Sequence, residues 1–445
     1  MFVFHEGFYT DVRIEDVFET SISYTQGKLD DSKVRRYRAA FIRLFDGKRW
    51  YYSATSDVNG IQEEINKLSR LGTPDVNIGE NPIVSAFEVN SETILAYENQ
   101  SVSDISKEEK DAFLHLLFPP LENRPLLKMW RAVYLDARKV LSFYSSKGAA
   151  LTFDFQKVGA AVKLSFSHGD KNLQESYQKG SSLYTDLSAM PDKLPEYLDK
   201  CEDFLLRSVP CTPGKHTVVL SPLAAGVFAH ESFGHKSESD FMVGDEALLR
   251  EWAIGKKVGS DLLSIVDKGS LSGTGYVPFD DEGTRCRENY LIKNGVLTGR
   301  LHSASSATAL NEGLTGNARA ISFEYEPIVR MTTTYILPGE KTKEALLREV
   351  EDGYFIDTIN HGSGMSTFTI APSRAYRIRN GELAEPVNIS VISGSVFETL
   401  SDIDGVSDKL ELLSFVTGGC GKLEQFPLPV SFGGPYVRVR NMNVQ

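Results

Sequence analysis

The chain has 445 residues, 41% of them hydrophobic and 24% charged, a balance that excludes fibrous and wholly disordered proteins. This length exceeds what one ordinary core accommodates, so two domains are expected. The formal net charge of −12 argues against direct binding to nucleic acid, because such binding requires basic surface that displaces counterions from phosphates.

Four cysteines are few for a chain of this length, which favours a reducing compartment over a disulfide framework. The first residues, MFVFHEGFYTDVRIEDVF, lack the basic and then apolar segments of a signal peptide. No stretch approaches the roughly eighteen apolar residues of a membrane-spanning helix. We therefore expect a cytoplasmic protein with no membrane partner.

The first half of the chain is predicted to contain strands and amphipathic helices. Alternation of polar and apolar residues predicts strands between residues 20 and 53 and again between residues 130 and 164. Helical spacing predicts three helices, at residues 61–71, 106–118 and 191–209. The second of these opens with Ser106 as its cap.

A turn-rich segment, VPCTPGK at residues 209–215, separates the two halves. We place the boundary there, which gives an N-terminal α/β domain over residues 1–212 and a sheet-rich C-terminal domain over residues 213–445. The clearest helix of the second half begins at Ser221 and Pro222 and carries AAGVFAHESFGH. Runs of strands and then helices indicate a two-domain α+β fold. The strands expected in the second half lie at residues 216–222, 353–359, 374–394 and 433–444.

The most informative motif is His230-Glu231-Ser-Phe-Gly-His235. Two histidines beside a glutamate are typical of zinc hydrolases, where the histidines bind metal and the glutamate takes a proton from water. Here the histidines are five residues apart, which places them about 140° out of line on an ideal helix. Either a π-bulge absorbs the extra residue, or the helix ends at Gly234 and His235 returns from a loop. The alternative is a helix with unconnected histidines and an incidental glutamate.

A catalytic zinc ion usually has three protein ligands, so a third is needed. Cys420, in the sequence TGGCGK, is the best candidate because its neighbouring glycines allow close backbone approach and a thiolate binds zinc strongly. The opposing interpretation is a small buried hydrophobe. Glu238 and Asp240 follow the histidines and could be ligands, part of a polar loop or, as we favour, acceptors that orient the imidazoles.

Two further stretches are candidates for lining the site. Residues 273–283 are rich in glycine and acidic residues but lack the Lys-Ser/Thr of a phosphate loop. We expect a tight turn there that brings Asp281 toward the site, although a plain β-turn explains the composition nearly as well. Residues 360–372, which include His361, are expected to line the substrate groove.

Four segments together resemble the TldD/PmbA family, proteins once labelled modulators of DNA gyrase and now understood as zinc metallopeptidases. They occur in the family's order across most of residues 217–445, whereas the N-terminal half resembles the family only loosely. The matching segments are HESFGHKSESD, PFDDEGTRCRENYLIKNGVLTGRLHSASSA, SRAYRIRNGELAEPV and GGCGK with the VRVRNM strand downstream.

The resemblance implies that His230, His235 and Cys420 bind one zinc ion per catalytic subunit and that Glu231 is the general base. The chain keeps the motif and so resembles the catalytic, TldD-like type. Such proteins form homodimers, or heterodimers with a TldE/PmbA-like subunit, around a chamber that admits short or unfolded peptides.

The predicted function is therefore zinc-dependent hydrolysis of peptides, with a metal-activated water and Glu231 as the base that later protonates the leaving amine. The substrate is expected to align as an added strand. One alternative is a non-enzymatic binding protein whose structural metal is completed by Glu238 or Asp240. Another is a regulator of nucleic-acid enzymes, against which the acidic charge argues.

Overall fold

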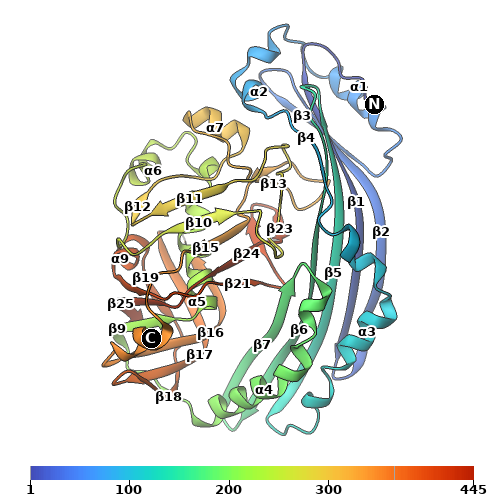
Figure 1. Ribbon diagram of the computed structural model, residues 1–445. Coiled ribbons are helices and arrows are strands. Elements are labelled where there is room, and N and C mark those ends of the chain that lie inside the picture. The colour runs from blue at the N-terminus through green and yellow to red at the C-terminus, as the bar shows by residue number, and fades with distance from the viewer. Residues whose placement is uncertain (1, 365) are drawn as a thin grey trace.

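The computed structural model describes residues 2–364 and 366–445 of the chain (Figure 1). Its first part is built around one long, curved sheet of seven strands, in the order β3-β2-β1-β5-β6-β4 with β7 paired to β6. All neighbours are antiparallel except β4 and β6. The strands are β1 Tyr9–Thr25, β2 Lys28–Phe45, β3 Trp50–Thr55, β4 Ser91–Ile94, β5 Leu127–Ser145, β6 Ala150–His168 and β7 Lys171–Ser181.

Four helices accompany this sheet, and three of them match the predicted positions. Ser106 caps the second predicted helix as expected, because its hydroxyl accepts a hydrogen bond from the Glu109 backbone N–H at 3.1 Å. Buried apolar residues of the third and fourth helices pack on one face of the sheet. The helices are α1 Ile61–Ser69, α2 Pro82–Ala86, α3 Lys107–His115 and α4 Met190–Arg207.

The second part of the chain lies against the opposite face of the long sheet and contains two larger sheets (Figure 1). One has the order β16-β9-β25-β19-β17-β18-β8, and the additional pairing of β16 with β17 closes part of it into a ring. The other has the order β12-β11-β10-β15-β24-β21. Together they enclose the largest apolar core of the molecule. This arrangement confirms the predicted two-domain α+β fold.

The elements of the second part are mostly short. Its helices are α5 Pro222–Phe228, α6 Glu246–Glu251, α7 Ala304–Leu310, α8 Lys343–Arg348 and α9 Val396–Ser401. Its strands are β8 Val209–Pro210, β9 Gly214–Leu220, β10 Ile265–Lys268, β11 Glu288–Lys293, β12 Val296–Leu297, β13 Ala318–Arg319, β14 Ile328–Val329, β15 Thr333–Ile336, β16 Asp352–Gly364, β17 Thr367–Arg379, β18 Glu382–Asn388, β19 Ile392–Ser395, β20 Ile403–Val406, β21 Glu411–Ser414, β22 Cys420–Lys422, β23 Gln425–Leu428, β24 Ser431–Gly434 and β25 Val437–Val444.

The chain passes from the first part to the second just after α4. Within the described residues, strands β1 to β7 pair only with one another and not with β8 or any strand after it. Strand β8, which begins at Val209, already belongs to the second part because it pairs with β18. Strand β8 precedes the division that the sequence places at residues 212 and 213, and that division stays a prediction. Nowhere in the described residues is a helix both long and apolar enough to cross a membrane.

Candidate metal centre

The His-Glu motif lies where a regular helix becomes a wider one. The Ser221 hydroxyl accepts a hydrogen bond from the Ala224 backbone N–H and starts α5 at Pro222. The chain then continues as a π-helix at Ala229–Gly234 and as a 3₁₀ turn at His235–Ser237. The π-helix absorbs one extra residue, so histidines five apart lie on the same side. Of the two backbone geometries that the spacing left open, this is the one observed.

The two imidazole rings lie close together as a result. The ring centroids of His230 and His235 are 5.0 Å apart, with an angle of 80° between the ring planes. A Cβ at Gly234 would lie 2.1 Å from the Met331 sulfur, so a larger residue there would force the Met331 side chain to move. The small residue therefore lets β15 and the segment before it pack directly against the π-helix.

Cys420 brings a sulfur to the same point from the other end of the domain. It is the first residue of β22, which forms a hairpin with β23, and it is reached through Gly418 and Gly419, both with positive φ. The Cys420 Sγ lies 3.7 Å from His235 Nε2. One donor atom from each of His230, His235 and Cys420 lies within 4.8 Å of the other two. The Arg330 guanidinium holds the hairpin by donating to the Cys420 carbonyl at 2.7 Å.

A chain of charged groups lies on the Nδ1 side of the His235 ring. None of these groups belongs to the three candidate metal donors. The buried Glu238 carboxylate lies 3.3 Å from His235 Nδ1, so it orients the ring. Lys422 neutralises this carboxylate from 3.1 Å, and also donates to Asp240 at 2.6 Å and to the Val329 carbonyl at 2.9 Å. Glu238 thus contacts the imidazole directly, whereas Asp240 acts on it only through Lys422.

The electrostatics of this cluster favour a thiolate. Burial alone would raise the pKa of the Cys420 thiol, but the adjacent His230 and His235 hold that pKa well below its usual value. For His235, burial lowers the pKa, but Cys420 and Glu238 more than compensate and raise it to about 10. These opposite shifts favour a thiolate on Cys420 and a proton on His235.

These residues fit a zinc ion. Two imidazoles and one thiolate form a common zinc donor set, and three protein ligands leave the fourth position for water or substrate. The buried His230 Nδ1 atom has no hydrogen-bond partner among the described residues. An orphaned buried nitrogen beside a thiolate carries a free-energy cost that binding of a cation would relieve.

Glu231 projects into a cavity of about 170 Å³ that the metal-facing residues border. No hydrogen bond or ion pair to its carboxylate exists among the described residues, which leaves the carboxylate available to substrate and water. We call this cavity the metal pocket; it is lined by Val227, His230, Glu231, Ile359, Asn360, His361, Gly362, Phe415, Gly419, Cys420, Val430 and Phe432. Strand β16 passes close by, since a Cβ at Gly364 would lie 2.9 Å from the Glu231 carbonyl oxygen.

The remaining predicted site residues divide between two places. His361 is exposed at the edge of the metal pocket, as is Asn360 from the same expected groove segment, whose Met365 lies outside the described residues. Asp281 lines a different cavity, which the glycine-rich stretch 273–283 also borders. There it accepts a hydrogen bond from the Ala320 backbone N–H at 2.7 Å.

Lys422 and Arg330 were not predicted from the sequence. A signal for Lys422 existed, because residues two apart on a strand share a face and Lys422 is two residues after Cys420. Arg330 is separated from the hairpin by 90 residues, and nothing in its local sequence indicates that contact.

Known proteins with similar sequences show which family this chain belongs to. A family model described as the PmbA/TldA metallopeptidase C-terminal domain matches residues 213–445, and the model of the first domain of the same family matches residues 10–71. A metalloprotease from Methanocaldococcus jannaschii is 37% identical, over 97% of this chain and 96% of its own length. The chain belongs to the TldD/PmbA family. It is accordingly a metallopeptidase with a metal cofactor.

Other members agree with this placement. A zinc metalloprotease TldD homologue from Saccharolobus solfataricus is 27% identical over 98% of this chain and 96% of its own length. The crystal structure of TldE from Thermococcus kodakarensis matches with a TM-score of 0.78, covering 98% of this chain and 96% of that one. A crystal structure of a putative modulator of DNA gyrase from Thermotoga maritima matches with a TM-score of 0.77, covering 99% and 96%. At 16% and 19% identity these two structures establish the shared fold.

Proposed function

We propose that this metallopeptidase hydrolyses short or unfolded peptides with one zinc ion held by His230, His235 and Cys420, and with Glu231 as the general base. The observation that carries the proposal is the convergence of the three donors beside a glutamate that no other described side chain engages. When bound, zinc acts as a Lewis acid that polarises the scissile carbonyl and acidifies water.

In this mechanism the chain's own residues move one proton. Glu231 accepts a proton from the attacking water on its carboxylate oxygen and later delivers it to the nitrogen of the leaving amine. Glu238 fixes the orientation of His235 through the 3.3 Å contact with Nδ1, and Lys422 keeps Glu238 ionised. Apolar side chains such as Val227, Ile359 and Phe432 line the metal pocket and lower its polarity, which strengthens these electrostatic interactions.

The size and position of the metal pocket favour extended peptides. A cavity of about 170 Å³ accommodates little more than one side chain, so a folded protein surface does not enter it. The edge residues Asn360 and His361 belong to β16, and a strand beside the site offers backbone groups to an extended substrate. We infer that substrate backbone, more than side chains, provides the contacts.

We also propose that the chain functions as a dimer in the cytoplasm, with a second copy or a TldE-like subunit. The hairpin that carries Cys420 exposes Leu423 at 79% and Phe426 at 59%, apolar surface that a partner would cover. The four cysteines are all free, which suits a reducing compartment. Light scattering on the chain alone and mixed with a TldE-like protein measures the assembly.

The test of the catalytic role is Glu231→Gln, which keeps the shape of the side chain and removes the base. We expect hydrolysis of an unstructured fluorogenic peptide to fall by about 100-fold or more, while zinc content stays at the wild-type level. The matched control is Glu246→Gln, an exposed glutamate on α6 in the same part of the chain. Full activity with zinc retained in the Glu231 variant would rule out the base and favour a structural metal; loss of zinc would mean that Glu231 helps to hold the metal.

A further inference from the structure

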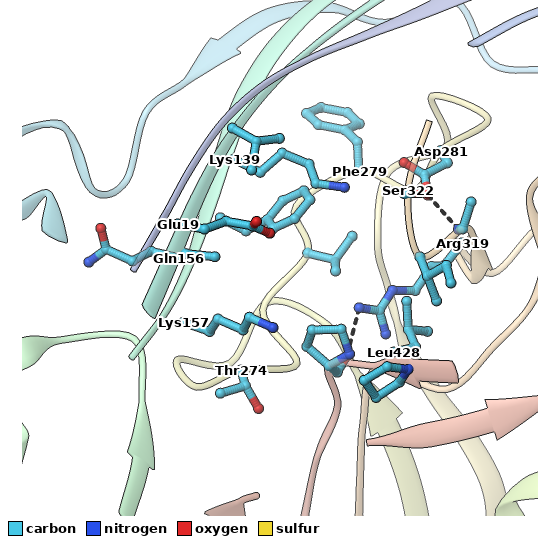
Figure 2. Close-up of a pocket in the computed structure, with 18 of the residues that line it drawn as sticks. Glu19, Lys139, Gln156, Lys157, Thr274, Phe279, Asp281, Arg319, Ser322 and Leu428 are labelled. Atoms are coloured by element: carbon cyan, nitrogen blue, oxygen red, sulfur yellow. Dashed lines mark hydrogen bonds between the residues drawn. The ribbon is translucent and has the colours of Figure 1, made fainter. Parts of the chain in front are cut away.

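A second cavity, of about 280 Å³, lies between the long sheet and the second part of the chain (Figure 2). Its lining shares no residue with that of the metal pocket. We call it the second cavity; it is lined by Val17, Glu19, Tyr37, Ala137, Lys139, Phe155, Gln156, Lys157, Thr274, Val277, Phe279, Asp281, Arg319, Ala320, Ile321, Ser322, Pro427, Leu428 and Pro429. None of these residues has a role in the proposed peptidase mechanism.

The floor of the second cavity consists of neighbouring rows of the sheet. Strand register places Glu19 opposite Ala137, and Ala137 opposite Lys157. The adjacent row on the same face joins Val17 to Lys139 and Lys139 to Phe155. Because side chains alternate between the two faces of a strand, both rows point toward the second part of the chain. Figure 2 shows Glu19, Lys139 and Lys157 projecting into the space, while Gln156 points away.

The roof is largely apolar and comes from three loops. Val277 and Phe279 belong to the glycine-rich stretch, Ile321 follows β13, and Pro427 and Pro429 flank the end of β23. Arg319 reaches into this roof and donates to the carbonyls of Met331 and Pro429, the latter at 2.8 Å. The second cavity thus has largely apolar walls, with the cationic Lys139 and Lys157 on its floor and Arg319 in its roof.

Most charged groups around the second cavity already have partners. Lys139 pairs with Glu15 at 2.9 Å, and Asp281 pairs with Arg13 at 3.4 Å. Glu19 lies 3.4 Å from Arg35, which is exposed at the edge of the sheet.

Lys157 and Arg319 are different. Within the described residues, neither has a carboxylate at ion-pair distance. Burial lowers the pKa of Lys157, and burial together with the nearby Arg330 lowers the pKa of Arg319 to about 10. Glu19 near Lys157 and Asp281 near Arg319 offset part of this effect, so the protein balances each positive charge only in part.

We propose that the second cavity binds a carboxylate carried on an apolar group, with Lys157 and Arg319 on either side of the anion and Phe155, Val277 and Phe279 around its body. Charge-assisted hydrogen bonds from an ammonium and a guanidinium are the strongest that a carboxylate forms in proteins. The volume lies near the lower end of the range for small-molecule sites, which fits one aromatic or aliphatic residue. Such a carboxylate belongs either to the C-terminal residue of a peptide or to a free small acid.

Calorimetric titration of the full-length protein tests this proposal. N-acetyl-phenylalanine is compared with its amide, which differs only in the charge, and 3-phenylpropanoate represents a free acid without a peptide group. The titrations use metal-loaded protein and are repeated with chelator, because a carboxylate also binds metal.

Binding to the second cavity is the part of the measured binding that remains when the metal has been removed by the chelator. We expect the acid to bind at least about tenfold more tightly than the amide. The better ligand of the two acids identifies the source.

Three variants connect this binding to the cavity. Lys157→Met should weaken binding of the acid about five- to tenfold and leave the amide unchanged. Glu19→Gln removes a neighbouring negative charge and should strengthen acid binding about two- to threefold. Lys163→Met, an exposed lysine on the same strand β6, is the matched control and should change nothing. Equal affinity for acid and amide, or unchanged acid binding in Lys157→Met, would overturn the proposal whatever the outcome for peptide hydrolysis.

Discussion

At the metal centre, the donor groups come from backbone that departs from regular structure, whereas the charged groups of the second cavity stand on long, regular strands. His230 lies on a π-helix, His235 on a 3₁₀ turn and Cys420 after two glycines with positive φ. In contrast, the pairing of β1 with β5 runs without interruption from Asp11 to Thr25. Irregular backbone brings distant donors to one point, while a regular sheet provides a broad floor with groups at fixed spacing.

The two regions also differ in how their charges are balanced. At the metal centre a thiolate faces an imidazolium, and Glu238 faces Lys422, so the opposite charges are matched within the protein. In the second cavity Lys157 and Arg319 lack such matches among the described residues. In our proposals the first region therefore receives a cation and the second an anion.

The largest effect that tests this contrast is removal of the sulfur in Cys420→Ala. Loss of one of three donors should weaken zinc binding by more than about 100-fold, beyond the loss of about 10–100-fold typical of residues that only orient a ligand. Competition with a chelator of known affinity measures this change. Cys211→Ala is the control, because this half-buried cysteine lies outside the donor group. Zinc affinity that survives the loss of the sulfur would remove Cys420 from the ligand set.

The next largest effect on zinc binding shows whether Glu238 acts by its contact with the His235 ring or only by its negative charge near Lys422. Glu238→Gln should weaken zinc binding about 10–100-fold, because the carboxylate that orients the imidazole is lost. Asp240→Asn removes the same charge beside Lys422 but does not contact the ring, so its effect should be several-fold smaller. The same chelator competition compares the two. Equal losses would mean that charge, and not orientation of the ring, is what Glu238 provides.

The sequence indicated which three residues converge at the candidate metal centre, but it did not indicate the arrangement of the cavities around them. The elements around Ser106, Ser221 and the Asn294-Gly295 turn follow local signals, namely a capping hydroxyl and residues that tolerate positive φ. Cys420 was found because its flanking glycines and the family resemblance both indicated it.

Asp281 illustrates what the sequence leaves open. Its stretch was recognised as a turn, but whether it faces the metal pocket or another cavity depends on how the two parts of the chain pack. That packing is set by contacts such as Arg13 with Asp281, which are separated by more than half the chain and leave no local pattern. The alignment of Glu19, Ala137 and Lys157 across three strands likewise depends on strand register. Turns and tertiary packing determine that register.

A smaller effect tests whether the irregular backbone needs its glycine. Gly234→Ala places a Cβ on the Met331 sulfur and should lower the free energy of unfolding by about 1–3 kcal/mol, measured by chemical denaturation. The double variant with Met331→Ala should recover part of that loss, because the clash is removed. The analogous change at Gly313, where an added Cβ meets no atom within 4 Å and φ is not positive, is the control for a glycine-to-alanine change without a clash. Additive losses in the double variant would show that the overlap does not limit stability.

The last test concerns protons at the metal centre. The pKa of His235 is raised to about 10 and the pKa of Cys420 is lowered well below its usual value, so we expect the pair to hold one proton, on His235, at pH 7.5. Zinc requires a neutral imidazole, so binding must release that proton, and affinity should rise about tenfold per pH unit up to about pH 10. A weakly buffered indicator dye at pH 7.5 should report one proton released per zinc bound. Release of none would mean that His235 is already neutral, and release of more than one would mean that Cys420 or water at the metal also gives up a proton.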